Sequence, residues 1–211
     1  MHRLRSAAVK ARTALVNQLR GLLAEFGISV LQGLPQLRRR ALPDVLTRQT
    51  TYRRCCVRSC TFSVSGCVRL DTEVARLTNR IEQLANADER CQALMQRRGV
   101  GPLIASAFTA ELCDPHAFHN GRQVAAWLGL VPRQHSSGGQ PMLLGVSKRG
   151  DAYLRTLLIH CARAAIRTAT RHTDAVSTWA ISVQARGDIH KATVALANKM
   201  ARQLWAQLAY G

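Results

Sequence analysis

The sequence predicts a mainly α-helical protein, and three observations support this fold class. Apolar residues recur at intervals of three and four over most of the chain, as on a helix with one buried face. Asp151, Asp174 and Asp188 each precede such a run, where a carboxylate accepts hydrogen bonds from free backbone N–H groups. Hydrophobic residues make up 47% of the 211 residues, which is enough for one sizeable core or two small ones.

The first predicted helix is basic and amphipathic and ends near Gly27. Its apolar stripe has helical spacing and consists of Leu4, Ala8, Ala11, Leu15, Leu19, Leu22 and Phe26. Residues 33–48 contain two prolines, so only a short helix or a loop is expected there.

Residues 50–68 fit neither a helical period nor strict alternation, and they hold four of the seven cysteines. We interpret this segment as irregular, either β-prone or altered by a slip of the reading frame. Heptad spacing then follows at Leu70, Val74, Leu77, Ile81 and Leu84. Two heptads are compatible with a helical hairpin or with a short seam between two chains. Residues 1–90 are therefore expected to form a basic, helical and coiled-coil-like linker region.

The charge of the chain predicts a polyanionic partner. Thirty Lys and Arg against twelve Asp and Glu give a formal net charge of +18. No apolar stretch approaches the roughly 18 residues that a membrane span needs. A basic helix that lies on a membrane surface is a third possibility, but the N-terminal stripe is rich in alanine and lacks interfacial aromatics, so no membrane partner is expected. The cysteines lack zinc spacing, and no metal ligands are predicted. Without an export signal, we expect reduced thiols in a cytoplasmic protein.

Residues 91–211 are predicted to form a second helical region, which begins with a helical hairpin. A helix ending near Met95 is separated by "RRGVGP" from one starting at Pro102. Gly99 and Gly101 let backbone N–H groups approach a phosphate, and counterions come from Arg97 and Arg98. This is the pattern of a helix-hairpin-helix that grips a nucleic-acid backbone. The alternative is an ordinary corner in which the glycines only make the bend.

A serine and glycine loop precedes the helix predicted at 151–170. A serine nucleophile needs an accessible hydroxyl, a way to lose its proton, and nearby positive charge. Gly138 and Gly139 leave space around Ser136 and Ser137. The cations that can surround a phosphate there are Arg133, His135, Lys148 and Arg149. Because G-x-S-x-G is absent and no strand is expected before the loop, phosphoryl transfer is favoured over acyl transfer. The alternative is a flexible connector.

Four long motifs, in order, resemble the C-terminal transposase domain of the insertion-sequence 110 family, in its 1111-like branch. They are "RRGVGPLIASAFTAEL", "AFHNGRQVAAWLGLVPRQHSSGG", "GVSKRGDAYLRTLLIHCARAAI" and "KATVALANKMARQLWAQL". The resemblance covers nearly all of residues 70–211, and "NQLRGLLAEFGI" is similar to the helix that leads into that region.

The resemblance implies a DNA recombinase that inserts a mobile element. A serine of the loop would attack a phosphodiester and form a phosphoserine-linked DNA intermediate. Ser137, which glycine follows directly, would be the nucleophile, with Ser136 as the reserve assignment. Lys148, Arg149 and Arg155 would face phosphates, and Ser147 would support the start of the helix. DNA, a guide RNA and further copies of the chain are the expected partners, at the nucleoid.

The resemblance also implies Mg²⁺, held by an acidic N-terminal domain. Residues 1–69 contain only Glu25 and Asp44 as acids, so the Mg²⁺ ligands are expected to be absent from this chain. The stretch "QPMLLG" also departs from the more polar family pattern. We therefore expect a truncated or decayed copy. The alternative function is a non-catalytic DNA- or RNA-binding remnant that associates with intact transposase subunits through its leucine stripes.

Overall fold

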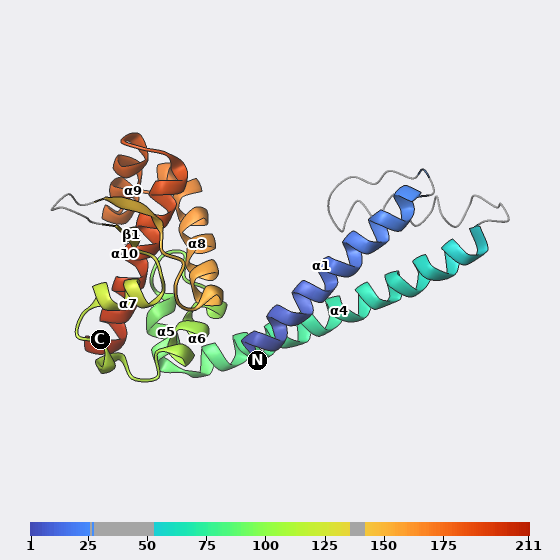
Figure 1. The fold of residues 1–211 in the computed structure, drawn as a ribbon. Coiled ribbons are helices and arrows are strands. Elements are labelled where there is room, and N and C mark those ends of the chain that lie inside the picture. The colour runs from blue at the N-terminus through green and yellow to red at the C-terminus, as the bar shows by residue number, and fades with distance from the viewer. Residues whose placement is uncertain (26, 28–52, 136–141) are drawn as a thin grey trace. The chain divides into compact units, whose positions relative to one another are not determined.

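The protein is mainly α-helical, as predicted. A computed structural model describes residues 1–25, 27, 53–135 and 142–211 (Figure 1). The chain divides into two compact units, Met1–Ile81 and Glu82–Gly211. The boundary predicted between residues 90 and 91 falls within the first short helix of the second unit, α5 (Glu89–Met95).

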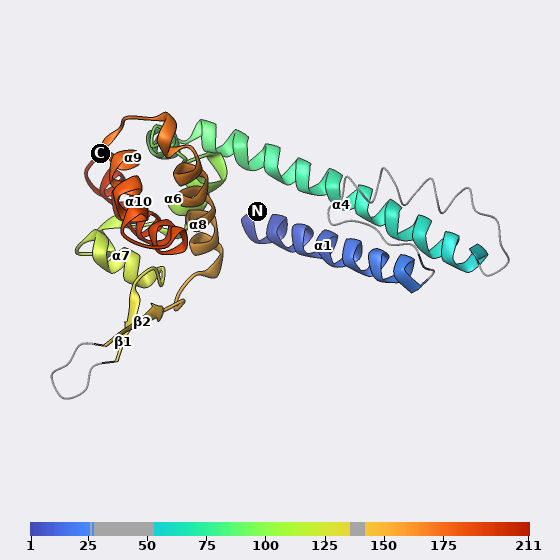
Figure 2. The same ribbon diagram turned by 90° about the horizontal axis from the view of Figure 1, so that it is seen from above.

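The first unit is an antiparallel pair formed by α1 (His2–Glu25) and the part of α4 (Arg53–Ala87) up to Ile81, and the two helices lie side by side in Figures 1 and 2. Arg5 Nε donates to Thr78 Oγ1 at 2.7 Å, and Arg12 Nη1 donates to Asp71 Oδ1 at 2.8 Å. Residue numbers fall along α4 as they rise along α1, which fixes the antiparallel direction. Of the two alternatives for the heptad stripe, the structure therefore forms the helical hairpin within one chain.

The stripe predicted for α1 is wrong at its start and only partly confirmed further on, where Leu15 and Leu22 are half-buried and Phe26 lies outside the described residues. Leu19 is buried as predicted, but Leu4 is 65% exposed and Ala11 is also exposed. Near the N-terminus, the face toward α4 instead carries Arg5 and Arg12, whose guanidinium groups bind side chains of α4. The predicted end is confirmed, because Gly27 has a φ of +72° and donates its N–H to Ala24 O at 2.9 Å.

The interpretation of residues 50–68 as irregular is wrong for residues 53–68, which belong to α4. Ser63 and Cys67 of α4 are buried. A Cβ on Gly66 of the same helix would lie 2.9 Å from Leu15 Cδ2 of α1. Small and polar residues occupy positions where a hydrophobic pattern expects large ones, so the helical period is not visible in the sequence. One heptad position is also corrected, because Leu84 is 47% exposed while Ala85 is fully buried.

The second unit is a helical bundle with one small hairpin. Its elements are α5 (Glu89–Met95), α6 (Pro102–Glu111), η2 (Pro115–Ala117), α7 (Gly121–Trp127), β1 (Pro132–Gln134), β2 (Leu143–Val146), α8 (Ala152–Arg167), η3 (Ala169–Arg171), α9 (Ala175–Ala185) and α10 (Ile189–Tyr210). Helix α10 is central and packs most extensively against α8 and α7 (Figure 1). Its buried face alternates alanines with Leu196, Met200 and Leu204, and the alanines allow neighbouring helices to approach closely.

The three aspartates expected at helix starts are N-caps, as predicted. Asp151 Oδ1 accepts the N–H of Leu154 at 2.7 Å at the start of α8. Asp174 begins α9 and Asp188 begins α10 in the same way. Each carboxylate accepts a hydrogen bond from a backbone N–H that has no acceptor within the helix. Three of the few acids in the chain therefore have a structural role.

Candidate nucleic-acid interface

A short β-hairpin carries both ends of the serine segment. Strands β1 and β2 are antiparallel, with Pro132 opposite Val146 and Gln134 opposite Leu143. Beyond them, His135 N–H donates to Met142 O at 2.9 Å, so the residues on either side of 136–141 are bonded to each other. Ser136 and Ser137 themselves lie outside the described residues, and their assignment as nucleophile stays a prediction.

The expectation that no strand precedes the serine segment is wrong. β1 precedes it, although Pro-Arg-Gln has little intrinsic preference for a strand. The strand forms because its backbone pairs with β2, which pattern reasoning on three residues cannot detect. Of the two grounds against acyl transfer, only the absence of a G-x-S-x-G motif from the sequence remains.

The base of the hairpin is fixed by a close crossing of two backbone segments at two glycines. Gly129 has a φ of +69°, and a Cβ there would lie 2.0 Å from Arg149 O. Gly150 has a φ of +103°, and a Cβ there would lie 1.8 Å from Trp127 O. Ser147 N–H also donates to Val131 O at 2.8 Å. The segments that enter and leave the hairpin are therefore in direct contact, which determines where it leaves the helical core.

Four of the predicted cations are exposed around this hairpin. Arg133 and His135 lie along β1 and after it, and Lys148 and Arg149 lie at its base. Lys148 has a φ of +55°, unlike every other non-glycine residue among those described. A lysine in this conformation carries a backbone cost, which the crossing at the neighbouring glycines imposes.

Arg155 and Ser147 have structural contacts instead. Arg155 Nη1 donates to Leu128 O at 3.0 Å, which ties α8 to the end of α7. Ser147 Oγ is buried without a hydrogen-bond partner among the described residues, and Asp151 rather than Ser147 caps α8. The phosphate role predicted for Arg155 stays a prediction.

The predicted Gly-x-Gly turn joins α5 to α6, and Arg98 and Gly99 there contact residues of later elements of the unit. Arg98 Nη1 donates to Asp174 Oδ1 at 2.5 Å and also to Ser177 Oγ, and its Nη2 donates to Thr168 Oγ1 at 3.0 Å. Gly99 has a φ of +81°, and its carbonyl accepts from Cys161 Sγ at 2.6 Å. These contacts agree with the structural alternative, an ordinary corner between helices.

Arg97 and Gly101 are the parts of this turn that remain open. Arg97 Nη2 donates to Gln207 Oε1 at 2.7 Å in an exposed position. Gly101 caps α6, and a Cβ there would meet no atom within 4 Å. A phosphate contact at these two residues stays a prediction.

Two groups near the turn have shifted pKa values. The hydrogen bond from Ser177, together with the backbone N–H of Ser177 and the guanidinium of Arg98, lowers the pKa of Asp174 to about 2. Burial raises the pKa of the Cys161 thiol to about 11. Both shifts stabilise the forms that the fold uses, an ionised cap and a neutral buried thiol.

Metal ligands are not gathered in the part of the chain that the structure describes. No three His, Cys, Asp or Glu side chains lie close enough there to hold a metal ion. The described residues thus do not fit a Mg²⁺ site, and we derive no step through Mg²⁺. None of the described helices is long and apolar enough to cross a membrane.

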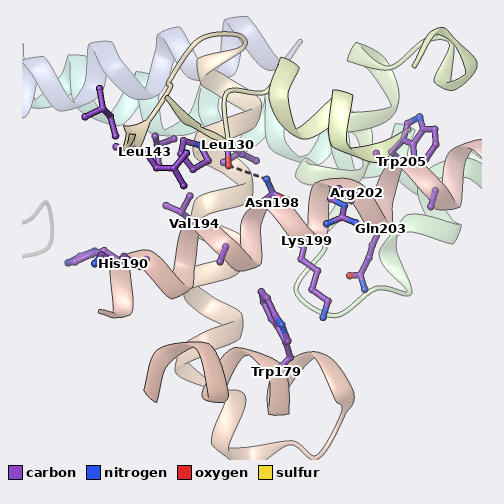
Figure 3. A pocket seen from close by; sticks show the side chains of 18 residues that line it. Leu130, Leu143, Trp179, His190, Val194, Asn198, Lys199, Arg202, Gln203 and Trp205 are labelled. Carbon is purple, nitrogen blue, oxygen red and sulfur yellow. Dashed lines mark hydrogen bonds between the residues drawn. The ribbon is translucent and has the colours of Figure 1, made fainter. Parts of the chain in front are cut away.

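Sequence reasoning missed a groove of about 1250 Å³ along α10. The hairpin borders it on one side and Trp179 of α9 on the other (Figure 3). Among its eighteen lining residues are Lys191, Lys199 and Arg202, and none is acidic. The spacing of these three cations in the sequence places them on one side of α10, and this spacing could have indicated a basic surface there.

The second unit is thus a helical domain with exposed cations around a hairpin and an acid-free groove, a class suited to polyanionic partners. Residues 91–177 match the family described as "Transposase IS116/IS110/IS902 family". Over these residues the chain matches a transposase domain of that family, as the sequence resemblance predicted.

Curated relatives extend the similarity to nearly the whole chain. A probable family 20 transposase of Pseudomonas aeruginosa is 44% identical over 99% of this chain and 62% of its own length. The transposase for insertion sequence element IS1111A of Coxiella burnetii is 41% identical over 98% of this chain and 57% of its own. The transposase for IS1328 of Yersinia enterocolitica is 32% identical, with 100% and 62% covered. The chain spans about 60% of the length of these relatives.

Proposed function

We propose that this chain acts in DNA transposition, with Ser137 as the nucleophile that cleaves and transfers a DNA strand. The observation that carries the proposal is the pairing of β1 with β2. Next to this pairing, His135 N–H donates to Met142 O, so the residues that flank 136–141 are bonded to each other. The relatives named above are transposases, which supports the role in transposition.

The proposed reaction is a substitution at phosphorus. The Ser137 hydroxyl loses its proton to a base or to water as its oxygen bonds to phosphorus. The bond from phosphorus to one deoxyribose oxygen breaks, and that oxygen leaves as a hydroxyl after taking up a proton. The phosphoserine link retains a phosphodiester, so a second DNA end can displace the serine by the reverse chemistry.

The described residues can supply positive charge near the phosphate that the serine attacks. Arg133, His135, Lys148 and Arg149 are exposed on the hairpin and at its base. Cations stabilise the negative charge that grows on the phosphoryl oxygens as serine attacks. The crossing at Gly129 and Gly150 fixes the base from which these side chains extend. The partners of the proposed reaction are DNA, a guide RNA and further copies of the chain, with Mg²⁺ in the assay.

The test is a covalent trap. The protein is incubated with DNA carrying the ends of its element, Mg²⁺ and guide RNA, and a protein–DNA adduct is sought by denaturing electrophoresis and mass spectrometry of the serine peptide. We expect an adduct that Ser137→Ala abolishes and Ser136→Ala retains. An adduct that only Ser136→Ala abolishes would move the nucleophile to Ser136.

The alternative function is a non-catalytic nucleic-acid binder. It predicts no adduct but binding whose affinity falls steeply with ionic strength. In the described structure, the leucine stripes expected to join other subunits pack α1 against α4 of the same chain. Binding by a remnant would then depend on the second unit.

A further inference from the structure

We propose that the groove along α10 binds a short stretch of single-stranded nucleic acid, with unstacked bases on its apolar and aromatic surface and phosphates at Lys191, Lys199 and Arg202. The site goes beyond the proposed strand transfer and needs no reaction at Ser137. It adjoins the hairpin, because Pro132, Leu143 and Val146 line its wall.

The surface of the groove is apolar on the hairpin side. Leu130 and Leu143 face Val194 across the edge of α10 (Figure 3). Leu143 is 67% exposed, although it is a large aliphatic residue in a strand. Asn198 Nδ2 donates to Leu130 O at 3.1 Å, which holds this wall against the helix. A fixed apolar surface of this kind suits the flat face of a nucleobase better than it suits water.

The opposite side offers an aromatic ring with a cation over it. Trp179 of α9 and Lys199 of α10 point toward one another, and Lys199 Nζ lies 4.2 Å from the ring centroid (Figure 3). The indole is only half-buried, so part of the ring remains accessible. A base that stacks on the ring in place of the Lys199 ammonium would leave that ammonium free to bind the phosphate of the same nucleotide. Stacking on aromatic side chains is the common way in which proteins hold unpaired bases.

Charge selects the occupant. None of the eighteen lining residues is acidic, and Lys191, Lys199 and Arg202 have no acidic partner among the described residues. Eleven residues separate Lys191 from Arg202, or about 16 Å along the helix, which exceeds the length of one nucleotide. A strand of several nucleotides can therefore contact all three cations.

A single strand fits these features better than a duplex or a protein. A duplex keeps its base faces stacked inside, so it would leave Trp179 and the leucines without a partner. An apolar helix of a protein partner would leave the three cations without counterions unless it carried acids at matching positions. A second copy of this chain is a poor source of such a helix, because the chain has only twelve acids in total.

The experiment measures binding of the full chain to fluorescent 16-mers of single-stranded DNA, single-stranded RNA and duplex DNA by anisotropy over a range of salt. The test variant is Lys199→Gln with Arg202→Gln. The matched control is Arg122→Gln with Arg163→Gln, which removes the same charge at exposed positions of α7 and α8 outside the groove. Circular dichroism establishes that both variants are folded.

We expect the groove variant to bind a single strand about 10-fold more weakly near 0.15 M salt and to lower the salt slope by about 1.4, or 0.7 for each phosphate contact. The control pair should change affinity less than about 3-fold. Preference for DNA or for RNA identifies the source of the strand, and either one supports the site. Equal losses in the two variants would show only general attraction to charge and would overturn the proposal.

Stacking is tested separately at Trp179. We expect Trp179→Ala to weaken single-strand binding about 5- to 100-fold, while Trp179→Phe retains most of the affinity because it keeps a ring. Binding of an oligothymidylate should quench tryptophan fluorescence more in the wild type than in Trp179→Phe, in which Trp205 is the tryptophan that still lines the groove. A different result would assign the groove to a protein partner instead. In that case an acidic helical peptide would bind at the groove, and the variants would bind single strands and duplex DNA as tightly as the wild type does. Ser137→Ala should bind normally, so loss of the adduct and loss of groove binding are separate results.

Discussion

The backbone crossing at the base of the hairpin gives a sharp test, the substitution Gly129→Ala. A Cβ at this position would lie 2.0 Å from Arg149 O, which is 1.4 Å inside the 3.4 Å where ordinary contact begins. The obstacle is backbone, so no side-chain rotation relieves it. The φ of +69° adds a second cost, because a residue with a Cβ is strained in this region.

The two costs have different sizes. The left-handed backbone accounts for about 1–2 kcal/mol. Forcing an extra carbon into a packed contact accounts for about 1–3 kcal/mol more. We therefore expect Gly129→Ala to lower the free energy of unfolding by about 2–5 kcal/mol, a large part of the stability of an ordinary domain.

Urea denaturation followed by tryptophan fluorescence measures this loss in the second unit alone, because all three tryptophans, Trp127, Trp179 and Trp205, lie there. Gly145→Ala is the control within the same unit, since a Cβ there meets nothing within 4 Å. Gly27 has a φ of +72°, and a Cβ there would meet no atom within 4 Å, so Gly27→Ala isolates the backbone cost. The helical circular dichroism signal reports this cost, because Gly27 lies in the first unit. A loss at Gly129 no greater than that at Gly27 would refute the close crossing.

Three other predictions concern single contacts. The pKa of Asp174, about 2, lies below that of an unfolded aspartate, so its contribution to stability is present above about pH 4 and is lost as the pH falls toward 2. The stability difference between wild type and Asp174→Asn should shrink over that range in acid titrations of unfolding. Asp71→Asn should destabilise the first unit by about 1 kcal/mol through its bond with Arg12, visible in circular dichroism but not in tryptophan fluorescence. Iodoacetamide at pH 8.5 should label exposed Cys113 quickly and buried Cys161 slowly in peptide maps, and equal rates would contradict the burial that raises the pKa of Cys161 to about 11.

Helix positions in the second unit could be predicted because local rules and packing agree there. Asp151, Asp174 and Asp188 mark helix starts by a bond to nearby backbone, which depends on three or four adjacent residues. The first unit was harder to predict. In α4 the small residues Ser63 and Cys67 are buried, and Gly66 beside them contacts Leu15 of α1, more than forty residues away in sequence. Such contacts leave no periodic signal in the segment itself.

The candidate site was predictable in composition but not in arrangement. The cations and glycines could be selected from the sequence, yet several have uses that only tertiary contacts reveal. Arg98 binds Asp174, and Arg155 binds the carbonyl of Leu128. Both are arginines in basic motifs, and nothing local separates them from exposed Arg133. The groove could not be predicted from one segment, because its lining comes from the hairpin and from three helices.

The groove and the hairpin share one support, which would connect the proposed strand binding to the proposed strand transfer. Asn198 of α10 bonds the carbonyl of Leu130, one residue beyond the crossing glycine Gly129. The wall of the groove and the base of the hairpin are therefore parts of a single backbone arrangement. A strand bound along α10 would lie beside the hairpin whose two strands flank residues 136–141. Positioning of this kind lowers the entropy cost of bringing a phosphate to a nucleophile, which is among the largest contributions that a binding site makes to catalysis.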